Sequence, residues 1–225
     1  RWLHPQKGVL APDRFIPLFE RNGFILQLDA AVWEAACQAL RRWLDAGYPV
    51  VPISINVSRL HIYNPDVCDT LVRLAEQYRL PHGLIELEVT ESLFIEDAAA
   101  LYRMMSRLRE EGFRLSMDDF GAGYSSLNML KNILVNTIKL DREFLNETVT
   151  TAKGRTVIQY TVAMAKELQM QVVPEGVETR EQADFLLEAG CTVAQGFYFS
   201  KPMPISDFEQ LAFGDGARGY TKGGQ

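Results

Sequence analysis

The alternation of strand-like and helix-like segments is the feature that most constrains how this 225-residue chain can fold. Short apolar stretches with period-2 patterning alternate repeatedly with longer amphipathic stretches, and no linker separates them. Such alternation predicts a parallel sheet covered by helices, either a closed (β/α)8 barrel or an open doubly wound sheet. An open sheet that binds nucleotides normally carries a glycine fingerprint in its first strand–helix turn, which this chain lacks. The α/β (β/α)8 TIM-type barrel is therefore the expected fold.

The expected elements include fewer clear strands than a full barrel needs, so a strand or two are short, irregular or absent at the front. Residues 1–213 are expected to form one barrel domain that lacks its first strand region. The glycine-rich residues 214–225 are expected to form a flexible tail. The expected strands span residues 49–57, 84–88, 113–119, 136–140, 171–174 and a short stretch that ends at Gln195, and the expected helices span 13–21, 26–46, 66–79, 97–111, 155–168, 181–189 and 205–213.

Composition narrows the class of protein. The net charge of −6, without any basic run, argues against duplex nucleic acid as a partner. No apolar run approaches the length of a membrane span and no signal-peptide pattern opens the chain, so this segment is expected to make no membrane contact. The cysteines Cys37, Cys68 and Cys191 are far apart and odd in number, which suits a reducing cytosol.

Polar residues stand at or just past the carboxyl ends of the expected strands. In a barrel these ends meet on one rim, which is where barrel enzymes place their active sites. Several acids and amides in register along this rim predict a divalent-metal site with oxygen ligands. The residues are Asn56, Glu88, Asp118, Lys139, Glu175 and Gln195.

Asp118 and Asp119 are adjacent carboxylates that repel each other unless a positive charge lies between them, and a divalent cation is the usual solution. Such metal ions would also let an acidic protein bind a phosphorylated ligand. Taken singly, other interpretations stay open: the Asp pair can cap a turn or helix, Asn56 can cap a turn, and Lys139 can be solvated. Glu88 and Glu91 can form surface ion pairs, and Glu175 can begin a helix. Taken together, their spacings respect one architecture and favour the site.

The motifs around these residues closely resemble those of the EAL-domain cyclic di-GMP phosphodiesterases. The similarity runs from RWLHP at Arg1 to about Phe213. It implies hydrolysis of cyclic di-GMP to linear pGpG by a metal-activated water, on a (β/α)8 barrel that holds two divalent cations, Mg²⁺ or Mn²⁺. The motifs are INVS around Asn56, LEVTES around Glu88, SMDDFGAGYSSL around Asp118, TIKLDREF around Lys139, VVPEGVET around Glu175 and QGFYFSKPMP around Gln195.

The resemblance also implies the role of each residue. Asn56, Glu88 and Asp118 resemble ligands of the first metal ion, with Asp118 bridging to a second ion that is also held by Asp119. Lys139 would orient or polarise the attacking water.

Glu175 resembles the family's essential glutamate, which acts either as general base or beside the second metal ion. Together with Lys139 and Asp119 it forms the catalytic group. Glu91 resembles the residue that pins the DDFG loop. Gln195 resembles a residue near the second-metal water or the nucleotide, and Arg1 the arginine that contacts the substrate.

The chain departs from the family pattern at its front. The Glu-Ala-Leu signature is expected a few residues before the arginine that matches Arg1, so its metal-binding glutamate and the opening strand are missing from these residues. We therefore expect weak or no hydrolysis from this exact chain, and full activity only when an upstream segment supplies the glutamate. Smaller departures are Ala122, where threonine is usual and regulation is affected, and Pro174, where alanine is common.

The alternative function is a catalytically inactive receptor that binds cyclic di-GMP and signals to a partner. An unrelated barrel hydrolase for another phosphodiester is a third class. The resemblance implies a bacterial, cytoplasmic homodimer that serves as the output module of a larger signalling protein with upstream sensory or GGDEF-type domains, where a membrane anchor would lie outside this segment.

Overall fold

The computed structural model of the chain describes residues 1–122 and 127–214, without the side chains of residues 95, 96, 127–129, 147 and 148. The hydroxyl-rich stretch 124–126 and the expected flexible tail after residue 214 lie outside the described residues. Within the described ranges, no helix combines the length and the apolar composition that crossing a bilayer requires.

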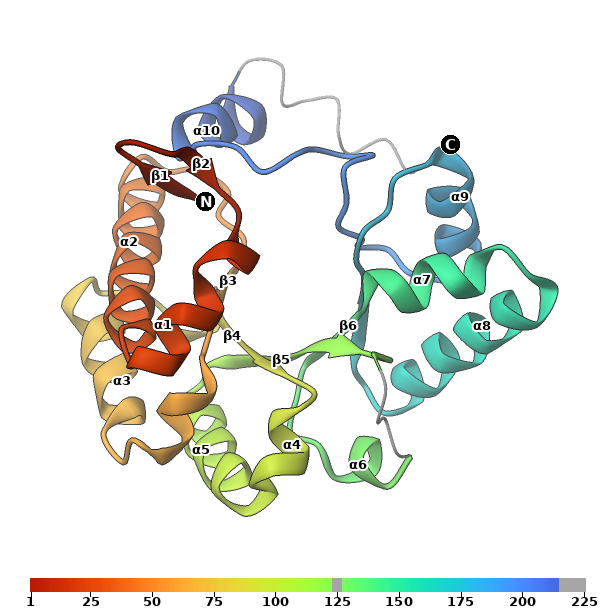
Figure 1. The fold of residues 1–225 in the computed structure, drawn as a ribbon, viewed down its shortest axis with the longest axis horizontal. Helices are drawn as coiled ribbons and strands as arrows, with labels where there is room; N and C mark the ends of the chain where they lie inside the picture. Colours follow the sequence, from red (N-terminus) through yellow and green to blue (C-terminus); the bar gives the residue numbers. More distant parts are fainter. Residues whose placement is uncertain (123–126, 215–225) are drawn as a thin grey trace.

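Five parallel strands form the central sheet, and they follow one another in space in the order in which they occur along the chain. Every neighbouring pair is parallel. Figure 1 shows these strands curving around a common centre with the helices outside them, which confirms the expected α/β TIM-type fold. The strands are β3 (Ile53–Asn56), β4 (Ile85–Thr90), β5 (Arg114–Phe120), β6 (Thr137–Leu140) and β7 (Gln171–Pro174).

Helices follow the strands and cover the outer face of the sheet (Figure 1). Several of them begin at a side-chain cap: Asp97, Asp141, Thr151 and Thr179 each accept a backbone N–H from the first turn of the helix that follows. The longer helices are α2 (Ile25–Asp45), α3 (Val67–Gln77), α5 (Ala98–Glu110), α8 (Ala152–Glu167), α9 (Arg180–Glu188) and α10 (Ile205–Phe213). The shorter ones are α1 (Ile16–Asn22), α4 (Leu93–Glu96), α6 (Leu127–Asn132) and α7 (Arg142–Val149), with 3-10 turns η1 (Pro12–Arg14), η2 (Arg59–Tyr63) and η3 (His82–Leu84).

Strand β4 places apolar side chains on the face that packs against the helices and charged side chains on the opposite face of the sheet. Ile85, Leu87 and Val89 are buried in the hydrophobic core. Because side chains alternate along a strand, the intervening Glu86 and Glu88 share the opposite face. The apolar residues of β4 therefore pack in the core, and its charged residues lie on the other face of the sheet.

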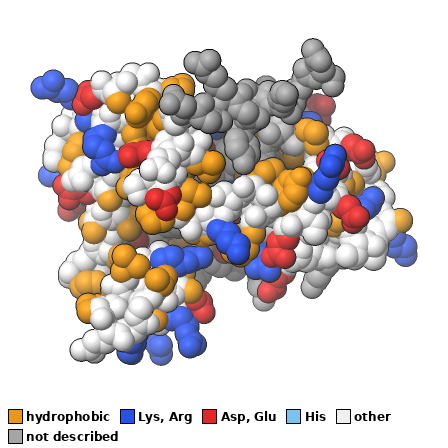
Figure 2. All heavy atoms as spheres, turned by 90° about the horizontal axis from the view of Figure 1, so that it is seen from above, with side chains coloured by type: hydrophobic (Ala, Val, Ile, Leu, Met, Phe, Trp, Pro, Cys, Tyr) orange, Lys and Arg blue, Asp and Glu red, His pale blue; other side chains and the backbone are white. Residues whose placement is uncertain are grey.

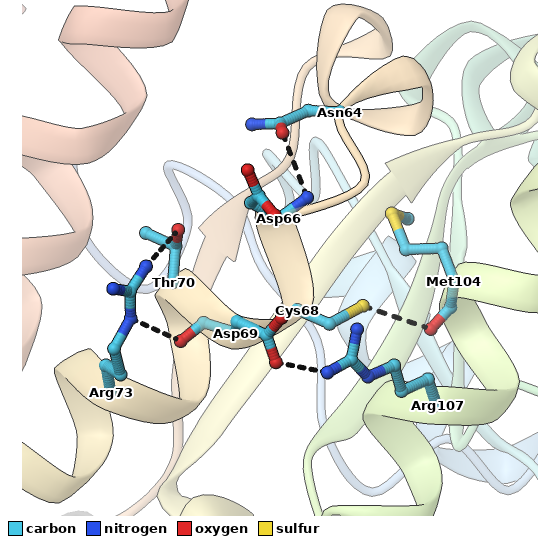
Figure 3. A network of polar contacts seen from close by, with 8 residues as sticks. All are labelled: Asn64, Asp66, Cys68, Asp69, Thr70, Arg73, Met104 and Arg107. Atoms are coloured by element: carbon cyan, nitrogen blue, oxygen red, sulfur yellow. Dashed lines mark hydrogen bonds and ion pairs between the residues drawn. The ribbon is translucent and has the colours of Figure 1, made fainter.

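Polar contacts join neighbouring helices on the outside of the sheet. Figure 3 shows α3 and α5 linked by the ion pair between Asp69 and Arg107, beside the Cys68 thiol, whose Sγ lies 3.9 Å from the carbonyl oxygen of Met104. Acidic and basic side chains are interspersed over the face seen in Figure 2. These contacts connect helices on the outside of the sheet, away from the strand ends where the candidate site lies.

Several expectations about elements need correction. The strand expected at residues 49–57 covers only Ile53–Asn56, and the helix expected at residues 155–168 begins at Ala152. The strand expected to end at Glu88 continues to Thr90. The expected helix 13–21 is divided into η1 and α1 at Phe15. The stretch that ends at Gln195 is not a strand, although the Gln195 amide donates to the Pro174 carbonyl at 2.8 Å. The next residue explains this irregularity, because a Cβ atom on Gly196 would collide with the backbone of Val177.

Several further elements were not expected from the sequence, among them the short helices α4 and α6. An antiparallel hairpin opens the chain, formed by β1 (Trp2–His4) and β2 (Gly8–Leu10). Helix α7 lies between β6 and α8. The hairpin strands are too short for a period-2 pattern to stand out.

The three cysteines are buried and form no disulfide. Burial raises the pKa of the Cys37 and Cys191 thiols to about 11, with Glu34 adding to the effect at Cys37 and Lys166 opposing it at Cys191. Burial also raises the pKa of Cys68. Since the thiolate is the reactive form, its population at Cys37 and Cys191 is expected to fall about 100-fold below that of an ordinary thiol.

We therefore predict that the native protein reacts slowly with a thiol-specific disulfide reagent at pH 8, and that all three thiols react rapidly in concentrated urea. The release of the reagent's chromophore measures both rates. Rapid labelling of three thiols in the native protein would show that these side chains are not enclosed.

Candidate active site

A buried lysine lies at the centre of the candidate site. Lys139 Nζ, on β6, lies 2.9 Å from Glu88 Oε1 and 3.5 Å from Asp118 Oδ1. It lies 2.5 Å from Glu175 Oε1, one residue past the end of β7. Lys139 and Glu88 are 8% and 6% exposed, so this cluster is largely withdrawn from water. Residues from four regions of the sequence thus meet at one ammonium group.

The register of the sheet explains why these side chains meet. Thr90 pairs with Asp118, and Leu140 pairs with Pro174, directly before Glu175. Since all five strands are parallel, their carboxyl ends lie on one rim of the sheet. The sequence-predicted residues Glu88, Asp118, Lys139 and Glu175 are therefore brought together.

The balance of charge in the cluster favours a cation. Burial alone would lower the pKa of Lys139, but Glu88, Asp118 and Glu175 outweigh burial and raise it, so the ammonium form persists. Burial raises the pKa of Glu175; Lys139 opposes that rise, whereas Asp118 and Glu88 add to it. Three carboxylates face one ammonium group, and the excess negative charge attracts further positive charge.

The backbone conformation of Asp119 differs from that of a regular strand residue. Its φ of 57° is left-handed, and its amide donates to Asp118 Oδ1 at 3.1 Å. The pairing of β5 with β6 shifts register between Met117 and Phe120 at the same place. Burial, then the negative charges of Asp118 and Asp141, raise the pKa of the Asp119 carboxyl group. The irregular backbone therefore directs two adjacent carboxylates differently at the strand end.

Glu91 holds the turn that follows these aspartates. Its Oε2 accepts the Gly121 amide at 3.0 Å, and its own amide donates to the Asp118 carbonyl at 3.0 Å. Gly121 has a φ of 98°, and a Cβ there would lie 2.8 Å from the ring of Phe144. Only glycine fits this turn, so Glu91 and the close packing together fix the position of the Asp118–Asp119 backbone.

Asn56, Arg1 and Gln195 flank the lysine cluster and take no part in its ion pairs with Glu88, Asp118 and Glu175. Asn56 pairs with Glu88 in the sheet register and, with Arg1, lines a cavity of about 910 Å³. Gln195 and Glu175 line a second cavity of about 710 Å³.

Arg142 also lines the second cavity, and its guanidinium group pairs with Glu178 at 2.7 Å. No role was expected for Arg142 from the sequence, although it lies within the TIKLDREF motif.

The donor atoms at the rim are those that Mg²⁺ and Mn²⁺ prefer. Asn56 offers an amide oxygen, and Glu88, Asp118 and Asp119 offer carboxylate oxygens. The described residues contain no ready-made group of three or more His, Cys, Asp or Glu side chains arranged around a metal position. The residues fit such ions in donor chemistry, and cation binding would require the Lys139 ammonium group to give up part of its contact with Glu88 and Asp118.

Comparison with known proteins places the chain in a family. The family model described as EAL domain matches residues 1–202. The bifunctional diguanylate cyclase/cyclic di-GMP phosphodiesterase MucR of Pseudomonas aeruginosa is 38% identical over 211 residues, which are 94% of this chain and 30% of that protein. The cyclic di-GMP phosphodiesterase NbdA of the same organism is 39% identical over 211 residues, 94% of this chain and 27% of that protein. The chain thus spans less than a third of either relative.

Solved structures agree with this placement. The PaMucR phosphodiesterase, solved as a c-di-GMP complex, superposes with a TM-score of 0.87 at 37% identity, over 92% of this chain and 84% of that one. The EAL enzyme Bd1971, in its cAMP and cyclic-di-GMP bound form, superposes with a TM-score of 0.86 at 28% identity, over 94% of this chain and 58% of that one. The fold of this chain is the fold of those proteins.

The Lys139→Met variant tests the charge balance of the cluster. Removing the ammonium group leaves three partly buried carboxylates without their shared partner, so we expect a loss of about 3–5 kcal/mol in the free energy of unfolding at pH 7.5. Denaturant melts in a chelating buffer measure this loss. Lys153→Met, at an exposed lysine of α8, is the matched control and should change stability little.

The loss should shrink as the pH falls. Without Lys139, which lowers the pKa of Glu175, burial and the charges of Asp118 and Glu88 raise that pKa unopposed. Folded Lys139→Met protein then holds more protons than its unfolded form, so its deficit grows as the pH rises through the raised pKa of Glu175 and is smallest below the ordinary value of 4.5. A deficit independent of pH would contradict the charge account.

The Glu91→Ala variant tests the clamp on the turn. Losing the acceptor leaves the Gly121 amide without its carboxylate partner, so we expect about 1–3 kcal/mol of destabilisation and faster amide hydrogen exchange in residues 118–122. Glu91→Gln keeps an acceptor oxygen and should lose less. Equal exchange in Glu91→Ala and the parent chain would exclude this role.

Proposed function

This chain belongs to the EAL domain family, and we propose from that premise that it hydrolyses a phosphodiester bond of cyclic di-GMP to give linear pGpG. The observation that carries the proposal is the Lys139 cluster, in which Glu88, Asp118 and Glu175 meet at the carboxyl ends of parallel strands. Barrel enzymes place their reacting groups on this rim. The relatives named for this activity match nearly the whole chain, which supports the choice of substrate.

The cofactors in this proposal are two divalent cations, Mg²⁺ or Mn²⁺. Asn56, Glu88 and Asp118 would hold the first, and Asp118 and Asp119 the second. When bound, such ions lower the pKa of water and neutralise the charge on a transferring phosphoryl group. They would also allow the acidic rim to accept a substrate with two phosphate groups.

The residues of the chain supply the remaining steps. Glu175 would take the proton from the attacking water, and its raised pKa brings the carboxylate closer to the range in which a general base works well. The water oxygen would bond to phosphorus as the bond to the 3′ oxygen breaks, and that oxygen would leave with the proton that Glu175 took from the water. Lys139, whose Nζ lies 2.5 Å from Glu175 Oε1, would orient or polarise the attacking water.

The flanking residues would position the substrate. Arg1 and Gln195 line cavities on the two sides of the cluster, so each can contact a different part of a dinucleotide. Glu91 would keep the Asp118–Asp119 turn in place through its bond to Gly121. These contacts would supply binding and orientation rather than chemistry.

The larger assembly is proposed on the same basis. The chain would act as a cytoplasmic homodimer in a bacterial signalling protein, next to sensory or GGDEF-type domains. Its match to 30% of MucR, a protein named for both diguanylate cyclase and phosphodiesterase activities, supports this arrangement.

Replacement of Glu175 by alanine tests the proposed chemistry. We expect the conversion of cyclic di-GMP to pGpG to fall by about 10²–10⁴-fold, because the base is removed from the rim. Chromatography of the products with Mg²⁺ or Mn²⁺ measures the rate. Glu188→Ala is the matched control, since Glu188 is an exposed glutamate of α9 that lines neither cavity.

The assay should use this chain and a form extended upstream of Arg1, because the signature glutamate is expected there. Turnover that survives Glu175→Ala, or a product other than pGpG, would contradict the proposal. If both forms bind cyclic di-GMP tightly and neither turns it over, the protein is a receptor and not an enzyme.

A further inference from the structure

Helix α2 carries a buried carboxylate against the chain that follows β3. Asp29 is 7% exposed, and Trp33, one helical turn further on, is 1% exposed. The other buried residues of α2 are uncharged. A charged group on this face is costly to bury, and an apolar side chain would pack there more cheaply. Asp29 therefore needs an explanation in the contacts that it makes.

The polar contacts of Asp29 and Trp33 go to the last residue of β3 and to the residues that follow it. Trp33 Nε1 donates to the carbonyl oxygen of Asn56 at 2.8 Å. The amide of Ser58 donates to Asp29 Oδ2 at 3.1 Å. Nε2 of the buried His61, in η2, lies 3.2 Å from the same oxygen, and its ring packs on Trp33 with 4.6 Å between centroids. Side chains of α2 thus form hydrogen bonds with the peptide groups on both sides of residue 57.

The ladder of β3 stops at these residues. Asn56 is exposed at the last position of the strand, and the Val57 amide still donates to the Glu88 carbonyl at 2.9 Å before the chain turns into η2. Helix α2 restrains the backbone on both sides of residue 57 through side chains.

We propose that Asp29, Trp33 and His61 are positioning residues for Asn56, which they hold so that its amide oxygen is presented beside Glu88. This inference rests on the proposed function, in which Asn56 contributes to the first cation site. The three residues touch neither substrate nor cation. They act through the backbone of residues 56–58, as outer partners of metal ligands commonly do.

The Trp33→Phe variant tests the proposal, with Trp43→Phe as its matched control. Trp43 is also buried on α2, and its Nε1 donates to Glu209 Oε1 at 2.7 Å, near α10 instead of β3. Each variant loses one indole N–H and keeps an aromatic ring. Thermal melting then reports any general loss of stability that the two share.

Two readouts separate positioning from stability. In Trp33→Phe, but not in Trp43→Phe, we expect faster amide hydrogen exchange at residues 56–58 and a rise of about tenfold in the Kd for Mn²⁺, measured by calorimetry without substrate. Asp29→Asn keeps an oxygen for the Ser58 amide, so it should affect both readouts less than Asp29→Ala.

The outcomes distinguish this inference from the proposed function. If Trp33→Phe and Trp43→Phe have equal exchange at residues 56–58, the positioning role is wrong. If exchange differs but the Kd for Mn²⁺ does not, the residues hold the loop without serving the cation, and the proposal is again overturned. These measurements use the form extended upstream of Arg1, which is expected to supply the signature glutamate. If that parent form binds no Mn²⁺, the cation site of the proposed function fails, and exchange alone decides whether Asn56 is held from α2.

Discussion

The ion pairing of one buried ammonium group with three carboxylates is the interaction on which the candidate site depends. Lys139 lies within 2.9 Å of Glu88 and 2.5 Å of Glu175, and Asp118 is 3.5 Å away. Without a shared positive charge, carboxylates from three strands would repel one another in a poorly hydrated interior. Burial opposes the charge on the lysine, and the carboxylates more than offset that effect. Removing any one charged member of the cluster is therefore expected to destabilise the protein.

The fold places this cluster by the same alternation that builds its core. Leu87 faces the core and Glu88 does not, and Ile138 and Lys139 divide in the same way on β6. Parallel pairing then carries the polar residues of every strand to the same rim. The apolar residues of each strand therefore pack against the helices and stabilise the fold, while the polar residues of the same strands form the candidate site.

Much of this arrangement could be predicted from the sequence, because alternation and strand-end polarity are local patterns. The α/β TIM-type fold is confirmed, and the helix expected at residues 205–213 has those bounds. Distances across strands are not local, so the direct ion pairs of Lys139 with Glu88 and Asp118 could not be read from the motifs. The contact of Trp33 with Asn56 was missed because it spans 23 positions of sequence. The irregular segment before Gly196 depends on close approach to a distant backbone, which no pattern in its own residues records.

The central claim is that the strand-end oxygens form a site for divalent cations. The most direct test is an anomalous-scattering map from crystals of the protein grown with Mn²⁺. We predict manganese density beside Asn56, Glu88 and Asp118, with Lys139 drawn away from at least one of the two carboxylates. Manganese found only elsewhere, with the Lys139 contacts to Glu88 and Asp118 intact, would contradict the account.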